Sequence, residues 1–151
     1  MKDKVVLITG GSRGIGRATA ILASQAGYKV GINYLKNKVL AAKTLEDIEK
    51  SGGNAVLLKG DISKEKDVNH IFTKLEQKFG KINYLVANAG LIPKRQEFHQ
   101  TDFNKIKESI NINFTGVIYC IHKFINLSEN KYKNRSIFRC AGKTRKMHQR
   151  T

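Results

Sequence analysis

A glycine-rich turn between the first apolar run and the first helical pattern constrains the fold of this chain more than any other feature. The apolar run covers residues 4–9, and the turn reads Gly10-Gly11-Ser12-Arg13-Gly14-Ile15-Gly16. An apolar run without alternation is typical of a strand buried on both faces of a parallel sheet. Glycines between such a strand and a helix let a diphosphate approach backbone N–H groups and the positive helix end. The turn therefore predicts a dinucleotide site; a glycine-rich turn with no ligand is the alternative.

Strand patterns and helix patterns alternate along the rest of the chain. Strands are expected at residues 4–9, 28–33, 54–59 and 82–87, with a fifth beginning at 136–138. Helices are expected from Ile15 to Gly27, at 38–50, from a cap at Ser63 to Gly80, and from a cap at Thr101 or Asp102 to about Leu127. This alternation indicates βαβ units. The predicted fold is α/β: a Rossmann-like, doubly wound parallel sheet of about four to five strands that is incomplete at its carboxyl half.

Charge is concentrated at the end of the sequence. The chain has 151 residues, enough for one domain, and a net charge of +16. Residues 131–151 hold eight Lys and Arg side chains and no Asp or Glu. Such a segment can contact nucleic-acid phosphates, but no aromatic residues interleave with the charges to stack on bases. A nucleic-acid role is therefore the weaker interpretation.

Other sequence features favour a cytoplasmic protein without a metal. No apolar stretch reaches the roughly 18 residues that span a bilayer, and the opening apolar run is too short for a signal peptide. Cys120 and Cys140 suit neither a disulfide framework nor a zinc site, and the four histidines show no metal-ligand spacing. We expect reduced thiols and no contact with a membrane.

Four motifs, in order, resemble the short-chain dehydrogenase/reductase family. Its nucleotide motif Thr-Gly-x-x-x-Gly-x-Gly is matched position for position by Thr9, Gly10, Gly14 and Gly16. The other matches are Asp61, Asn88-Ala89-Gly90 and Asn113-Phe114-Thr115-Gly116. The resemblance spans residues 1 to about 137. It looks closest to the classical members that include 3-oxoacyl-carrier-protein reductases and glucose 1-dehydrogenase-like oxidoreductases.

The resemblance implies a bound nicotinamide dinucleotide and a small carbonyl or alcohol substrate. In the family, the residue at the position of Asp61 contacts the adenine, and those at 88–90 support the sheet and border the cofactor. The cofactor-binding residues are expected to be Gly10, Ser12, Arg13, Gly14, Ile15, Gly16, Asn33, Tyr34, Asp61, Ile62, Asn88, Ala89 and Gly90.

The exit of the second strand favours NADP over NAD. Selection of NAD usually uses an acidic residue there, which binds the ribose 2′-hydroxyl and repels a 2′-phosphate. Between Asp3 and Glu46 the sequence has no acidic residue. Arg13, with Lys36 or Lys38, would instead attract the phosphate. Ordinary solvated surface is the alternative for either lysine alone.

The catalytic residues that the family implies are matched only in part. Family members use a tyrosine, a lysine, a serine and an asparagine, of which Asn113 matches the asparagine as a remnant. The Tyr-x-x-x-Lys pair belongs several tens of residues beyond Asn113, and only 38 residues follow it. Tyr119 and Lys123 have the right spacing in the wrong element, and Tyr34 and Lys38 lie at the adenosine end. We expect neither pair to be catalytic and Tyr119 to pack within its helix.

The character of the sequence changes after about residue 137. Residues 138–151 form a basic, non-periodic tail, whereas 1–137 is expected to be the partial nucleotide-binding domain. A reading-frame disruption is one hypothesis for this change. A doubly wound sheet normally continues beyond this point, so an unpaired sheet edge and low stability or self-association are predicted.

Taken with the resemblance, these patterns predict an NADP-binding oxidoreductase that is truncated and catalytically impaired. The alternatives are a non-catalytic NADP-binding or interaction half-domain and, less favoured, a basic nucleic-acid-associated protein.

Overall fold

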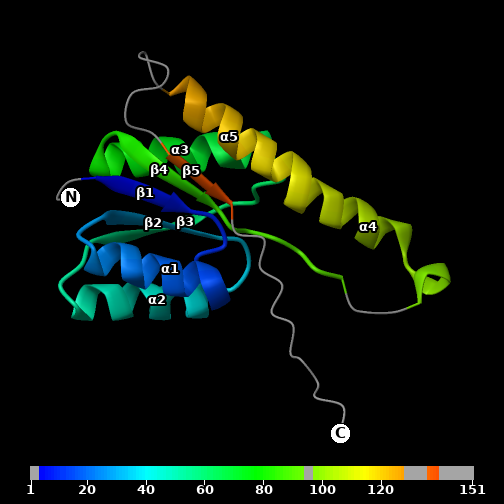
Figure 1. The fold of residues 1–151 in the computed structure, drawn as a ribbon, viewed down its shortest axis with the longest axis horizontal. Coiled ribbons are helices and arrows are strands. Elements are labelled where there is room, and N and C mark those ends of the chain that lie inside the picture. Colours follow the sequence, from blue (N-terminus) through cyan, green and yellow to red (C-terminus); the bar gives the residue numbers. More distant parts are fainter. Residues whose placement is uncertain (1–3, 94–96, 128–135, 140–151) are drawn as a thin grey trace, which may run out of the picture.

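Five parallel strands form one sheet in the order β3-β2-β1-β4-β5 (Figure 1). The computed structural model describes residues 4–93, 97–127 and 136–139. The strands are β1 Val5–Ile8, β2 Lys29–Tyr34, β3 Ala55–Lys59, β4 Ile82–Ala87 and β5 Ser136–Arg139. The chain runs outward from β1 to β3 and then crosses to β4, so the direction of winding reverses between β1 and β4. The predicted doubly wound α/β fold is confirmed.

Helices cover both faces of this sheet. They are α1 Gly14–Gln25, α2 Lys38–Lys50, α3 Glu65–Phe79, α4 Phe103–Ile110 and α5 Gly116–Asn126, with a short 3-10 helix η1 at Phe98–Gln100. In Figure 1, α1 and α2 lie below the sheet, and α3 and α5 lie above it. No helix in the described part of the chain has the length and apolar character needed to cross a membrane.

Two apolar clusters, one on each face, form the core. The cluster under α1 and α2 contains Ile8, Ala20, Ile32 and Ile48. The cluster under α3 and α5 is built around Leu7, Phe72, Leu85 and Phe124, each at most 1% exposed. Successive strand residues point to opposite faces, so each short apolar strand contributes to both clusters. The sheet is therefore anchored from both sides, and the loops at its carboxyl edge are left to form a site.

The long predicted helix from Asp102 to Leu127 contains an irregular turn. The Asp102 carboxylate accepts the Asn104 N–H at 2.8 Å, so Asp102 is the predicted cap. A π-helical segment η2, Asn111–Thr115, separates α4 from α5. Hydrophobic periodicity does not distinguish one widened turn from a regular helix, which is why the sequence did not show it.

The predicted helix cap at Ser63 is wrong. Helix α3 begins at Glu65, with Lys64 in the cap position and no side-chain cap. The Ser63 hydroxyl and N–H both donate to the Asp61 carboxylate, at 2.7 and 3.0 Å. Because this carboxylate already closes a local turn with Ser63, the hydroxyl is not available to the helix.

Candidate nucleotide-binding site

The glycine turn is packed so closely that two of its positions exclude any side chain. Gly10 has a φ of +64°, and a Cβ there would lie 2.9 Å from the Ala89 Cα atom. A Cβ on Gly16 would overlap the carbonyl oxygen of Gly10. These glycines let the first turn of α1 sit directly against the loop after β4.

Gly14 is different, because the space beside it is open. Its φ is +55°, and a Cβ there would meet nothing within 4 Å. Arg13, in the cap position of α1, makes no side-chain cap hydrogen bond, and the first turn carries no acidic residue. The helix therefore begins with uncapped N–H groups and its positive dipole end beside open space, which fits a phosphate group.

Thr9 and Asn88 tie the turn to the switch point between β1 and β4. The Thr9 hydroxyl accepts the N–H groups of Asn88 and Ala89 at 2.9 and 3.0 Å. The Asn88 side chain donates to the carbonyls of Thr9 and Gly10 at 2.9 and 3.2 Å. The two loops are therefore held together by reciprocal hydrogen bonds.

Asn33 supports the same turn from β2. It is 2% exposed; its side-chain oxygen accepts the Gly10 N–H at 3.4 Å, and its amide donates to the carbonyls of Leu58 and Gly60 at 3.1 and 3.0 Å. These partners occupy both ends of the side-chain amide. Asn33 therefore shapes the turn, and its contact with the cofactor stays a prediction.

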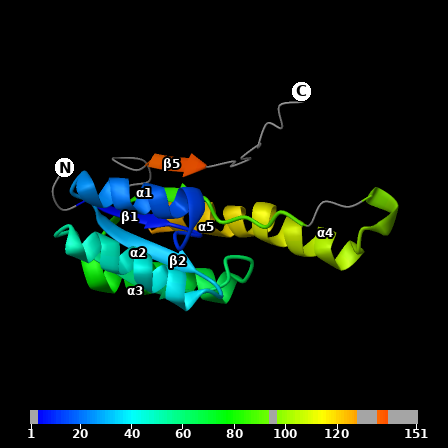
Figure 2. The ribbon, with the colours of Figure 1, turned by 90° about the horizontal axis from the view of Figure 1, so that it is seen from below.

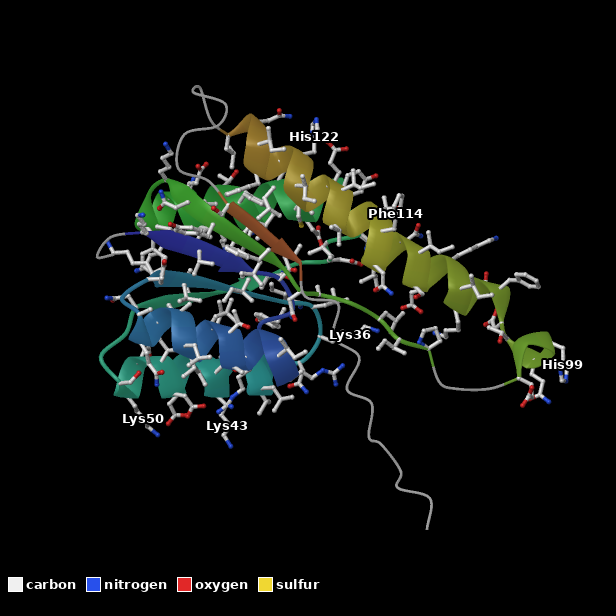
Figure 3. The ribbon with its side chains drawn as sticks, viewed as in Figure 1. Lys36, Lys43, Lys50, His99, Phe114 and His122 are labelled. Atoms are coloured by element: carbon white, nitrogen blue, oxygen red, sulfur yellow. The ribbon has the colours of Figure 1, made fainter. Side chains whose placement is uncertain are left out.

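A cleft of about 500 Å³ lies between the loops that follow β2 and β3 and the helix α4. It is lined by Leu35, Lys36, Asp61, Ser63, Lys64, Asn104, Lys107, Glu108, Asn111 and Ile112. Figure 3 shows Lys36 at the carboxyl edge of the sheet, on the side that faces α4. Three lysines against two carboxylates make the lining net positive, and the Asp61 carboxylate is already bonded to Ser63. The cleft suits an anionic ligand.

Asn113 lies inside the widened turn and holds the loop after β4. Its side-chain oxygen accepts the Leu91 N–H at 2.7 Å, and its amide donates to the Leu91 carbonyl at 2.9 Å. The Ser109 hydroxyl also donates to this carbonyl, at 3.1 Å, and accepts from Asn113 at 3.1 Å. Gly90 is close, because a Cβ there would lie 3.3 Å from the Asn113 side-chain oxygen.

The other predicted cofactor-binding residues differ in how exposed they are at the carboxyl edge of the sheet. Ile15 is 43% exposed at the start of α1, and Ser12 is half-buried, with its carbonyl accepting from Thr44 at 3.3 Å. Tyr34 and Ile62 are buried, at 7% and 4% exposed. Ile62 packs in the cluster that contains Phe72 and Phe124. Contact of Tyr34 and Ile62 with the cofactor stays a prediction.

Sequence reasoning did not single out several residues that shape the site. Thr9 is predicted only as part of the glycine motif, and no sequence pattern points to Ser109, Lys64 or Lys107. The position of Thr9 directly after an apolar strand, at the start of the turn, is the one sequence signal for its role. Lys64 and Lys107 approach one cleft from different helical regions, so no local pattern pairs them.

Tyr119, the tyrosine of the pair with Lys123, packs as expected. It is partly buried against the cluster that contains Phe72 and Phe124. It lines a groove between α3 and α5 with His122 and Asn126. This groove has no lining residue in common with the cleft at the sheet edge.

Comparisons with known proteins agree with this geometry. The family model described as short chain dehydrogenase matches residues 4–141. An uncharacterized oxidoreductase of Escherichia coli K12, YgfF, is 37% identical over 121 residues, which cover 80% of this chain and 49% of the relative. The chain thus spans about half the length of this curated relative.

Two solved structures show the same fold. A short chain dehydrogenase from Burkholderia cenocepacia J2315, in complex with NADP, is 29% identical with a TM-score of 0.78 over 83% of this chain and 51% of that one. Levodione reductase is 26% identical to this chain, with a TM-score of 0.79. The match covers 84% of this chain and 50% of the levodione reductase chain. These relatives give no support to the nucleic-acid alternative, and none tests the finer resemblance to carrier-protein reductases. The family model matches most of the length of this chain, and the chain therefore belongs to the short-chain dehydrogenase family.

Proposed function

We propose that this chain binds NADP, with the diphosphate at the glycine turn and the adenosine end in the lysine-lined cleft. The observation that carries the proposal is the open space beside Gly14, at a helix start without a side-chain cap. The Burkholderia cenocepacia relative is a complex with NADP, which supports the same ligand class here. The boundary expected at residue 137 falls within β5, Ser136–Arg139, so the nucleotide-binding part would extend at least to the end of this strand. We expect the protein to act in the cytoplasm.

The preference for NADP over NAD rests on charge at the exit of β2. Lys36 follows this strand by two positions and lines the cleft, and Arg13 is exposed at the start of α1. No acidic residue lies between them in the sequence to repel a 2′-phosphate. A guanidinium and an ammonium here would hold the phosphate by charge-assisted hydrogen bonds.

The reaction itself is proposed from family membership. A bound nicotinamide supplies hydride exchange with a carbonyl or alcohol carbon. The chain contributes the turn, the cleft and the Asn113 contacts that shape the loop at Leu91. Tyr119 and Lys123 have the spacing of the family's Tyr-x-x-x-Lys pair, but they line a groove that is separate from the cleft. We therefore propose nucleotide binding as the function that the described residues support.

A comparison of two lysines tests the cofactor preference. Titration with NADPH and NADH, followed by nucleotide fluorescence, should show tighter binding of NADPH. Lys36→Glu should weaken NADPH binding about tenfold or more and leave NADH binding nearly unchanged, since a lost charge-assisted contact costs about 1.5–3 kcal/mol. Lys43→Glu is the matched control, because Lys43 is an exposed lysine on α2 outside the cleft (Figure 3).

Three outcomes would contradict this proposal. If neither nucleotide binds, the site at the glycine turn is wrong. If both nucleotides bind equally well, or if both lysine variants weaken NADPH binding equally, the preference assigned to Lys36 is wrong while the site itself stands.

A further inference from the structure

A buried side-chain amide lies between the glycine turn and the loop that follows β3. Asn33 is the residue before the last of β2, and β2 lies between β1 and β3 in the sheet. The strand arrows in Figures 1 and 2 point toward the side of the molecule that carries α4, so Asn33 lies near the carboxyl edge of the sheet. A buried polar group lowers stability unless it is hydrogen-bonded, so its partners show what this amide holds.

The hydrogen bonds of Asn33 reach both neighbouring loops. On one side its side-chain oxygen accepts the Gly10 N–H at 3.4 Å, and its backbone carbonyl accepts the Gly11 N–H at 2.9 Å. On the other side its side-chain amide donates to the carbonyls of Leu58 and Gly60, at 3.1 and 3.0 Å. One residue of β2 therefore connects the turn after β1 with the loop after β3.

The loop after β3 is itself held by local hydrogen bonds. Asp61 follows Gly60 directly and lines the cleft. The Asp61 N–H donates to the Asp67 carboxylate at 2.8 Å, and the Asp61 carboxylate accepts the Ser63 N–H at 3.0 Å. Because the loop is braced in this way, a shift of Gly60 would carry the adjoining wall of the cleft with it.

We propose that Asn33 is a positioning residue that fixes the distance between the glycine turn and the loop at Asp61. The proposal rests on the proposed function, in which these two places bind the diphosphate and the adenosine end of one dinucleotide. A ligand that fills two places at once gains affinity only while the spacing of the places matches its own length. In this role Asn33 favours the intact dinucleotide over its separate parts.

Two asparagines that join neighbouring strands provide matched variants. Asn33→Ser removes the side-chain amide, and the shorter hydroxyl cannot bridge the two loops. The control is Asn83→Ser: the Asn83 side-chain oxygen accepts the Val5 N–H at 2.9 Å and joins β4 to β1 at the amino edge of the sheet. Asn33→Asp, which keeps the shape and replaces the amide donors, is the second variant if Asn33→Ser does not fold.

Titration with NADPH, adenosine 2′-monophosphate and inorganic pyrophosphate separates the two places. Nucleotide fluorescence gives the NADPH affinity, and amide chemical shifts give the millimolar affinities of the two parts. Asn33→Ser should weaken NADPH binding about tenfold or more and each part less than about threefold, because each place stays intact while their spacing is lost. Asn83→Ser should change all three affinities by less than about threefold, and the Tm of each variant shows that folded protein is titrated.

The outcomes distinguish this role from the nucleotide site itself. If the wild type does not bind NADPH, the proposed function is wrong. If the wild type binds NADPH, an unchanged NADPH affinity in Asn33→Ser overturns the role of Asn33. Losses for the two parts as large as the loss for NADPH, or an equal loss in Asn83→Ser, also overturn it. A wild type that binds neither part at millimolar concentration would contradict the description of two linked places.

Discussion

Gly14 combines a left-handed backbone with open space where the phosphate is proposed to lie. Gly14→Ala should cost about 1–2 kcal/mol of stability, because a side chain at a φ of +55° is strained. It should also weaken NADPH binding tenfold or more, since the methyl group enters the open space. Gly27→Ala is the control: Gly27 has a φ of +86° and an equally open Cβ position after α1. Thermal unfolding should show similar losses for both, and equal NADPH affinities would contradict the site.

Cys120 makes stability depend on pH in the alkaline range. Burial in α5 at 1% exposure raises the thiol pKa from 9.0 to about 12. Between these values the unfolded chain loses the thiol proton while the folded chain keeps it, so stability falls as pH rises. From pH 9 to about 10.5 this group should remove about 1–2 kcal/mol. Urea unfolding of the wild type and Cys120→Ala at both pH values measures the difference; parallel pH dependence in the two proteins would refute the assignment.

At the scale of elements, the Asn113 side chain holds the widened turn between α4 and α5 to the loop after β4, and Ser109 of α4 bonds to the same loop. Asn113→Ala removes partners from both the N–H and the carbonyl of Leu91 and should cost about 1–3 kcal/mol. Ser109→Ala should cost less, because the Asn113 amide still donates to the Leu91 carbonyl. Asn126→Ala, at the exposed end of α5, should change stability by less than about 0.5 kcal/mol. Urea unfolding gives these values, and an Asn113 variant as stable as the Asn126 variant would show that the contact is not needed.

At the scale of the whole molecule, nucleotide binding and turnover should be separable. The chain is expected to bind NADPH without oxidising it efficiently, because the Tyr119 and Lys123 pair lines the groove between α3 and α5 and not the cleft. NADPH absorbance with and without the protein measures this. Tyr119→Phe should bind NADPH like the wild type. Sustained turnover that Tyr119→Phe abolishes would show that the pair in α5 is catalytic after all.

Local patterns were sufficient to predict most of the elements. The strand at Ile82–Ala87 and the helix at Lys38–Lys50 were predicted with the observed bounds. The second strand was expected one residue early, and the cap at Ser63 was wrong because Asp61 competes for the same hydroxyl. Errors of this kind arise at the ends of elements, where side-chain hydrogen bonds, and not apolar spacing, decide the boundary.

The sequence by itself determined the fold class, the glycine turn and the absence of an acid after the second strand, because each depends on residues close together along the chain. Only the tertiary structure decided which distant residues meet: Asn33 bonds to Gly10, Asn113 bonds to Leu91, and Lys36 and Lys107 line one cleft. It also decided which apolar residues stay exposed on β5. Periodicity assigns a side chain to a face of its own element, whereas burial depends on what packs against that face.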